Sequence, residues 1–216
     1  MINARTTVLA VTTLLVTLTN PSPASGKIAL RRVEAAAVPK TMKYRGKLVA
    51  AIAWRDRNGE NTVLFSILRI SNGAREDASA YNFVNHYATA GGRTRRLRQV
   101  KDRVERCSVD ITMRFEPKAL SVTDLDGDGI GEVTFAYWMG CRGDVSPDGL
   151  KLLVLEGGDK YIIRGRGHWA RCDAKAAADD EACRDARKLG PALRKGPPAF
   201  RRHALKVWAR ISPQRI

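Results

Sequence analysis

An acidic, glycine-rich segment lies between two stretches that both have the pattern of β-strands. It runs Asp-Leu-Asp-Gly-Asp-Gly-Ile-Gly-Glu from Asp124 to Glu132. Residues 109–116 before it alternate between apolar and polar side chains, and residues 133–139 after it are mostly apolar. Alternation with a period of two is typical of a strand with one buried face. The sequence therefore predicts a β-hairpin whose loop carries several carboxylates.

The oxygen donors of this loop have the spacing of a calcium site. Asp124, Asp126 and Asp128 occupy positions one, three and five, so a backbone that coils around an ion brings their carboxylates together. A glycine at position six permits the sharp turn, Ile130 offers its carbonyl oxygen, and Glu132 completes the set directly or through water. Without a cation the three aspartates would repel one another. We therefore predict that these residues bind Ca²⁺.

The loop differs from a helix–loop–helix calcium site, and a plain turn is the alternative to a metal site. A helix–loop–helix calcium site carries a bidentate glutamate at position twelve, whereas Phe135 stands there in an apolar segment. The alternative is an ordinary turn of aspartate and glycine. The segment Asp56–Asn61 has a similar but degenerate pattern, with Arg57 inside it and no third aligned carboxylate. We interpret that segment as a plain turn.

The rest of the chain fits a fold built from hairpins. Turn signals separate residues 48–54 from 62–70 and residues 150–155 from 161–164, and each pair has strand character. The basic segment 93–106 fits either a strand or a short helix. The predicted fold class is mainly β, an antiparallel sheet or a sandwich of hairpins, followed by a C-terminal helical segment.

Two helices are predicted in that C-terminal segment. Residues 174–189 are rich in alanine and charged side chains, a composition that favours a helix. Residues 200–211 place apolar side chains at three- and four-residue spacing, which predicts an amphipathic helix packed on the sheet. We expect four regions: a signal peptide at 1–24, a lead-in at 25–43, a β domain at 44–170 and a basic helical tail at 171–216.

The N-terminal residues have the pattern of a secretory signal peptide. Arg5 precedes an apolar run from Val8 to Leu18, and Ser22 and Ala24 are the small residues before the cleavage point. The run is shorter than the ~20 residues that span a bilayer, and no later segment is long and apolar enough. We expect a periplasmic or secreted protein with no transmembrane segment after cleavage.

Four cysteines stand in the part that remains after cleavage. An even number of cysteines in an exported protein favours disulfides, and four cysteines allow three pairings. We favour Cys107 with Cys141, across strands that flank the calcium loop, and Cys172 with Cys183, within one polar segment. A metal site is a weaker interpretation, because each cysteine stands alone.

The chain is strongly basic, with 38 lysines and arginines against 22 aspartates and glutamates. Such a charge favours anionic partners, although an arginine-rich composition common to a whole proteome is an equal alternative. Export argues against nucleic acid as the main partner. An anionic cell-surface glycan or another envelope protein fits better, bound through the basic segments 93–106 and 194–215.

Several segments together resemble a family of exported bacterial proteins named surface polysaccharide biosynthesis proteins. The likeness covers about residues 44–168 and is carried by Asp124–Glu132, Tyr137, the cysteine-containing segment 141–147, Lys151 and residues 160–165. The acidic loop by itself is similar to the hairpin calcium loops of FG-GAP and related β-repeat proteins. The family resemblance implies a link to surface polysaccharide or lipopolysaccharide and carries no catalytic residues over to this chain.

Three functions compete on the sequence alone. The first is a calcium-stabilised, non-catalytic envelope protein, because the three histidines have no metal-ligand spacing and no nucleophile or phosphate-loop motif is present. The second is a hydrolase or transferase acting on glycan, with Asp144 and Glu132 as its carboxylates. The third is an inhibitor or a binding protein for an envelope partner. Asp144 and Ser146, in the loop after Cys141, are candidate functional residues.

Overall fold

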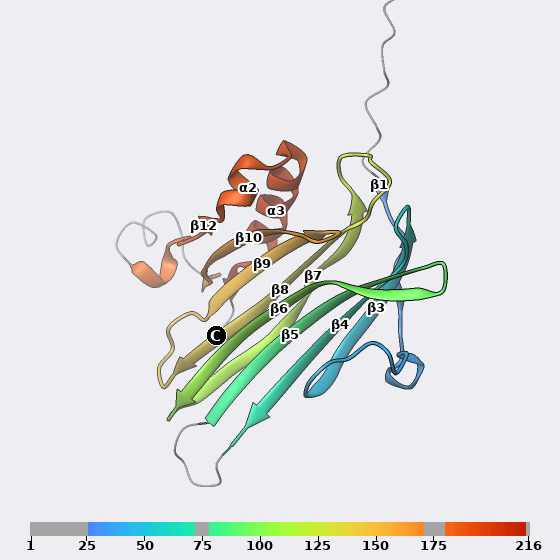
Figure 1. Cartoon of the computed structure of the whole chain (residues 1–216). Coiled ribbons are helices and arrows are strands. Elements are labelled where there is room, and N and C mark those ends of the chain that lie inside the picture. Colours follow the sequence, from blue (N-terminus) through green and yellow to red (C-terminus); the bar gives the residue numbers. More distant parts are fainter. Residues whose placement is uncertain (1–25, 72–77, 171–179, 215–216) are drawn as a thin grey trace, which may run out of the picture.

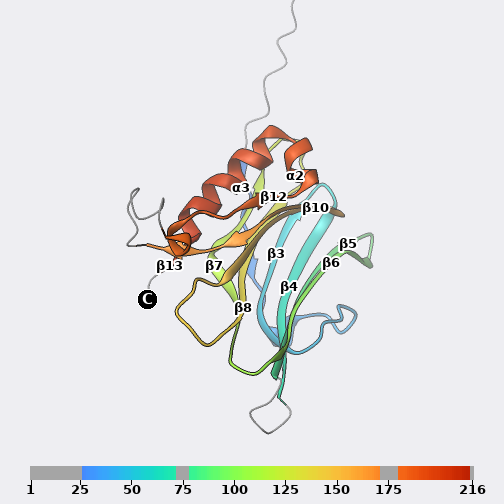
Figure 2. The same ribbon diagram turned by 90° about the vertical axis from the view of Figure 1, so that its left-hand side faces the viewer.

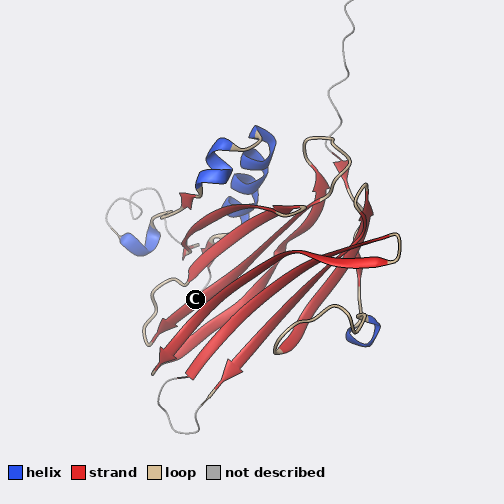
Figure 3. Cartoon of the chain, viewed as in Figure 1, coloured by secondary structure: helices blue, strands red, loops and turns tan. Residues whose placement is uncertain are grey.

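Two antiparallel β-sheets pack face to face and form most of the molecule (Figure 3). The computed structural model describes residues 26–71, 78–170 and 180–214. The predicted mainly β class, with antiparallel hairpins and a C-terminal helical segment, is confirmed. The predicted signal peptide, 1–24, lies outside the described residues.

The first sheet is a meander of four long strands with a short strand at one edge. Its order is β2-β3-β4-β5-β6, formed by β2 (Arg31–Arg32), β3 (Lys47–Asp56), β4 (Gly59–Ile70), β5 (Ala78–Ala90) and β6 (Arg93–Cys107). The predicted hairpin is therefore β3 and β4. The basic segment that fitted a strand or a helix is the strand β6. Its inward residues Val100 and Val104 are spaced for a strand and pair with β5.

The second sheet contains the acidic loop, and its strand order is β1-β7-β8-β9-β10-β12. The strands are β1 (Gly26–Lys27), β7 (Asp110–Asp124), β8 (Glu132–Arg142), β9 (Gly149–Glu156), β10 (Asp159–Arg166) and β12 (Lys188–Leu189). A separate parallel pair joins β11 (His168–Trp169) to β13 (Pro213–Gln214). The structure also contains two short 3-10 turns, η1 (Ala35–Ala37) and η2 (Glu181–Cys183). Both predicted hairpins of this sheet, around the acidic loop and around residues 157–158, are present.

The C-terminal segment packs onto the second sheet instead of extending away from it. The helices α2 (Pro191–Lys195) and α3 (Pro198–Ile211) cover the face that points away from the first sheet (Figures 1 and 2). Proline suits the first turn of α3, where the amide has no helical partner. The predicted apolar stripe of α3 is buried against the sheet: Phe200, Ala204, Val207, Trp208 and Ile211.

The predicted helix at residues 174–189 is wrong where the structure describes it. Residues 180–189 form the turn η2 and the strand β12. Leu189 pairs with Ile163 of β10, and the Asp185 carboxylate accepts a hydrogen bond of 3.0 Å from Nε1 of Trp208. These tertiary contacts outweigh a helix propensity of a few tenths of a kcal/mol per residue. Residues 174–179 lie outside the described residues.

A hydrophobic core lies between the two sheets. Phe65 of the first sheet meets Phe135 of the second edge to face, with ring centroids 5.4 Å apart, and Phe115 packs against Phe65 at 5.0 Å. Aromatic pairs in this arrangement add about 0.5–1.5 kcal/mol each to the stabilisation from burial. Phe135, which occupies position twelve counted from the start of the acidic loop, is thus a core residue.

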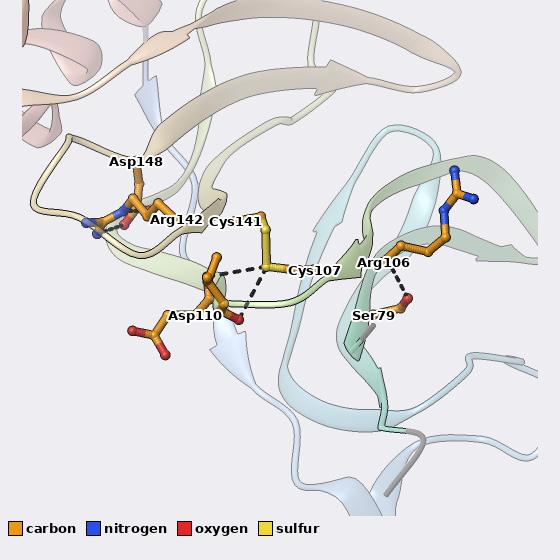
Figure 4. The surroundings of a disulfide bond; sticks show 8 residues. Ser79, Arg106, Cys107, Asp110, Cys141, Arg142 and Asp148 are labelled. Carbon is orange, nitrogen blue, oxygen red and sulfur yellow. Dashed lines mark hydrogen bonds and ion pairs between the residues drawn. A yellow bond between two sulfur atoms is a disulfide. The ribbon is translucent and has the colours of Figure 1, made fainter. Parts of the chain in front are cut away.

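A disulfide joins the two sheets at one end of this core. Cys107 at the end of β6 is bonded to Cys141 near the end of β8, with Cα atoms 5.7 Å apart (Figure 4). The predicted pairing is confirmed, but Cys107 belongs to the strand before β7 and to the other sheet, so the bond links sheets and does not flank the loop. Cys172, the predicted partner of Cys183, lies outside the described residues.

His86 of β5 makes the stability of the fold depend on pH. The side chain is buried, packs 5.2 Å from the Trp54 ring, and has Nε2 2.9 Å from Oδ1 of Asn61. Burial lowers the pKa of His86 from 6.5 to about 4, although the Asp56 carboxylate opposes this shift. The folded state therefore favours the neutral imidazole. The stabilisation is complete above pH 6.5 and is lost as the pH falls towards 4.

We expect the free energy of unfolding to fall by about 3 kcal/mol over this pH interval because of His86 alone. Urea unfolding at several pH values, with calcium held at saturation, measures the slope. The variant His86→Gln keeps a polar group near Asn61 but does not titrate, so its slope between pH 6.5 and 4 should be shallower. Identical slopes for the two proteins would contradict the assignment.

Candidate metal centre

The loop between β7 and β8 is coiled by hydrogen bonds from its own amides to its aspartates. Asp124 accepts from the amides of Gly127, at 2.7 Å, and Gly129, at 3.1 Å. Asp128 accepts from the amide of Ile130 at 2.7 Å. The two glycines have φ of 78° and 79°, in the left-handed region that favours glycine. This local chemistry turns the carboxylates towards the inside of the loop.

The four predicted carboxylates converge. One oxygen atom from each of Asp124, Asp126, Asp128 and Glu132 lies within 4.8 Å of the others. Calcium binds oxygen at 2.3–2.6 Å, so two ligand atoms of one such ion lie at most about 5 Å apart. The cluster can therefore hold one metal ion. Ile130 lies in the same loop, and its role as a carbonyl ligand stays a prediction.

Glu132 provides an observation independent of this convergence. Its side chain is fully buried, and its Oε2 accepts a hydrogen bond of 2.8 Å from the Leu125 amide. Its other oxygen, Oε1, has no hydrogen-bond partner among the described residues. An ionised carboxylate oxygen that is buried without a partner costs several kcal/mol, and either a proton or a bound cation relieves that cost. The donor set thus fits a cation in the loop.

The electrostatics of the loop agree with this fit. Burial raises the pKa of Glu132 to about 8, against the Leu125 hydrogen bond that lowers it, and the carboxylates of Glu156, Asp126 and Asp124 raise it further. A bound divalent cation would reverse this effect, because it favours the ionised form of every carboxylate around it.

A fifth carboxylate, Glu156, was missed by the sequence reasoning. Glu156 ends β9 and stands directly opposite Glu132 in the β8–β9 register. Burial raises the pKa of Glu156 to about 7, with further contributions from Asp126 and Asp128. Like charges directly opposite each other destabilise a sheet. The turn at residues 157–158 shows where β9 ends, and pairing β9 with β8 from that end places Glu156 beside the acidic loop. The position of Glu156 could therefore have been found from the predicted hairpin register.

The turn between β3 and β4 supports the acidic loop from the other sheet (Figure 1). Oδ2 of Asp56 accepts hydrogen bonds from the Gly131 amide, at 2.9 Å, and from Nε1 of Trp54, at 3.0 Å. The Arg57 amide donates to the Gly129 carbonyl at 2.9 Å. This segment is a turn, as expected, and its contact with the acidic loop has no local signal among its residues.

The second predicted site lies elsewhere. Glu132 begins β8 and Arg142 ends it, and ten residue steps along a strand span about 34 Å. Asp144 and Ser146 follow Arg142, so the structure does not bring Asp144 to Glu132. Paired carboxylates in glycoside hydrolysis are within about 10 Å of each other. The two carboxylates named for a glycan-acting enzyme therefore do not form one site.

Asp144 and Ser146 are held by hydrogen bonds within their own loop. The Ser146 amide and hydroxyl donate to the Asp144 carboxylate at 3.0 and 3.1 Å, and these bonds lower the pKa of Asp144. Arg142 closes the loop with two bonds to the buried Asp148, at 2.7 and 3.0 Å (Figure 4). The geometry favours a structural loop.

Removal of the Arg142 guanidinium should destabilise the protein. In Arg142→Ala, the Asp148 carboxylate stays buried without its cation, which costs about 3–5 kcal/mol for a buried pair and less here because Arg142 is partly exposed. Asp144→Ala is the matched control, since Asp144 is exposed and should change the free energy of unfolding by less than about 1 kcal/mol. Equal losses in urea unfolding would contradict this account of the loop.

Comparison with protein-family models, with curated proteins and with solved structures finds no significant match. Among the described residues, no helix has the length and apolar character needed to cross a membrane.

Proposed function

We propose that this chain is an exported, non-catalytic envelope protein in which one calcium ion braces the β-sandwich and whose ligand is an anionic surface glycan. The observation that supports calcium binding is the buried Oε1 of Glu132, which lies beside three converging aspartates and has no hydrogen-bond partner among the residues that the structure describes. Calcium suits the site because all its donors are hard oxygens and because this ion accepts them in a flexible coordination geometry.

A brace fits the surroundings of the loop better than a switch. The loop contacts the other sheet through Asp56 and Arg57, and the strand that follows is fixed in the core by Phe135. Sensor sites change the angle between two helices, whereas here two paired strands leave the loop. Calcium would therefore hold the two sheets together at this end.

Two observations support a non-catalytic role. Glu132 and Asp144 lie at opposite ends of β8, and Asp144 is engaged with Ser146. Carboxylates that hold calcium stay ionised, which suits them poorly to act as general acids.

Export and glycan binding rest on other features. The N-terminal pattern of a signal peptide and the Cys107–Cys141 disulfide support an oxidising compartment, periplasmic or secreted. The excess of 38 basic over 22 acidic residues favours an anionic ligand. The resemblance to surface polysaccharide biosynthesis proteins points to a surface glycan or lipopolysaccharide.

Retention on immobilised polygalacturonate tests this function. The mature protein, supplied with calcium, should bind polygalacturonate beads and should pass through beads that carry neutral dextran. The length distribution of soluble polygalacturonate should not change during incubation with the protein. Retention by neither bead would contradict glycan binding, and shortening of the polymer would contradict the non-catalytic role.

A further inference from the structure

The second sheet carries a group of cations on the face that it turns towards the first sheet. Ile162 of β10 packs in the core between the sheets, so Lys160 and Arg164, two residues to either side, point to the same face. Along one strand the two residues are about 13 Å apart. Most residues on a sheet face that packs against another sheet are apolar, because burying a charge there is costly. The cations on this face are therefore unusual.

A row of like charges crosses three neighbouring strands on this face. Lys188 of β12 stands opposite Arg164 of β10, which stands opposite Lys151 of β9. Neighbouring strands lie about 4.8 Å apart, so the row spans about 10 Å. Directly opposed like charges destabilise a sheet unless an anion lies between them.

The strand β6 of the first sheet borders this row. Val100 of β6 is in the core, so Arg98 and Asp102 point to the same side. Arg98 has a buried Nε with no hydrogen-bond partner among the described residues. Burial, followed by Arg164 and Arg98, lowers the pKa of Lys160, which agrees with these cations being neighbours.

One carboxylate lies in the group, and its oxygens are already engaged. Asp102 accepts a hydrogen bond from the hydroxyl of Tyr137 and another, of 2.7 Å, from Nζ of Lys151. Within the part of the chain that the structure describes, no carboxylate forms an ion pair with Lys160, Arg164 or Lys188. The excess positive charge of the group is therefore uncompensated.

We infer that Arg98, Lys151, Lys160, Arg164 and Lys188, here named the basic shelf, bind an extended oligoanion that carries carboxylate or phosphate groups along its length. The shelf spreads its charges over about 13 Å by 10 Å, which suits a chain of charges better than a single ion. This inference rests on the proposed binding of an anionic glycan and places that ligand between the edges of the two sheets. Within the basic segment 93–106, which the sequence predicts to contact the ligand, the inference assigns this contact to Arg98.

Two variants with the same loss of charge test the shelf. Lys160→Gln combined with Arg164→Gln removes two shelf cations, and Lys40→Gln combined with Lys43→Gln removes two exposed cations before β3. Isothermal titration with a short oligogalacturonate and with a linear polyphosphate of matched length, at saturating calcium, gives Kd. A neutral maltooligosaccharide is the ligand control, and comparison of the two anions tells carboxylate from phosphate recognition.

We expect the shelf variant to raise Kd by about tenfold or more and the control variant by less than about threefold. The shelf variant should also melt no lower than the wild type, because it relieves repulsion between like charges. Equal weakening in the two variants, or an unchanged Kd in the shelf variant, would overturn the shelf while leaving glycan binding in place. A wild type that binds neither anion would overturn both.

Discussion

Chelation of calcium should lower the melting temperature of the mature protein by about 5–10 °C. A ligand present at a hundred times its Kd stabilises the folded state by about 2.7 kcal/mol. For a domain of this size, 1 kcal/mol corresponds to about 2–4 °C. The physical cause is the acidic cluster, in which Glu132 and Glu156 face each other beside three aspartates without a cation to separate them.

Asp126→Ala should make the melting temperature insensitive to EDTA. Asp126 is the best choice among the aspartates, because Asp124 and Asp128 accept the stronger hydrogen bonds that coil the loop. Asp144→Ala is the matched control, since it removes an aspartate from an exposed loop at the far end of β8. The control should respond to EDTA like the wild type. Full sensitivity to EDTA in Asp126→Ala would exclude the loop as the site.

Loss of the Cys107–Cys141 disulfide should destabilise the protein by about 4 kcal/mol, or on the order of 10 °C. The bond closes a loop between residues 34 apart in sequence, and the estimate is the loop-closure entropy that the bond removes from the unfolded chain. The variant is Cys107→Ala combined with Cys141→Ala, because Cys107 is buried and alanine introduces no polar group there.

Thermal melts with and without a reducing agent provide the control for this variant. Reduction should lower the melting temperature of the wild type by at least as much as the double substitution does. If reduction lowers the melting temperature of the variant further, that additional change comes from a disulfide between the remaining two cysteines. Hydrogen exchange should accelerate first at the ends of β6 and β8, where the bond joins the sheets. A double variant with the same melting temperature as the wild type would contradict the stabilising role of this disulfide.

The hairpins and the acidic loop could be predicted because their signals are local. Alternation over residues 109–116 defines β7, and the loop that follows carries its ligands within nine residues. The predicted stripe of α3 is local in the same sense, since residues three and four apart share a helix face.

The supports of the site could not be predicted, because they depend on contacts between distant segments. Asp56 reaches the Gly131 amide across 75 residues, and Glu156 becomes a neighbour of Glu132 through strand register. The composition of residues 174–189 predicts a helix, because composition reflects propensity and not the strand pairing that Leu189 makes with β10. Long-range pairing thus decided both the missed residues and the wrong helix.

Calorimetric titration of the mature, EDTA-treated protein with calcium measures binding at the loop itself. We expect one calcium ion bound per chain, and none in Asp126→Ala under the same conditions. Wild-type protein that binds no calcium, or a variant that binds it as the wild type does, would contradict the assignment of the loop Asp124–Glu132 as a calcium site.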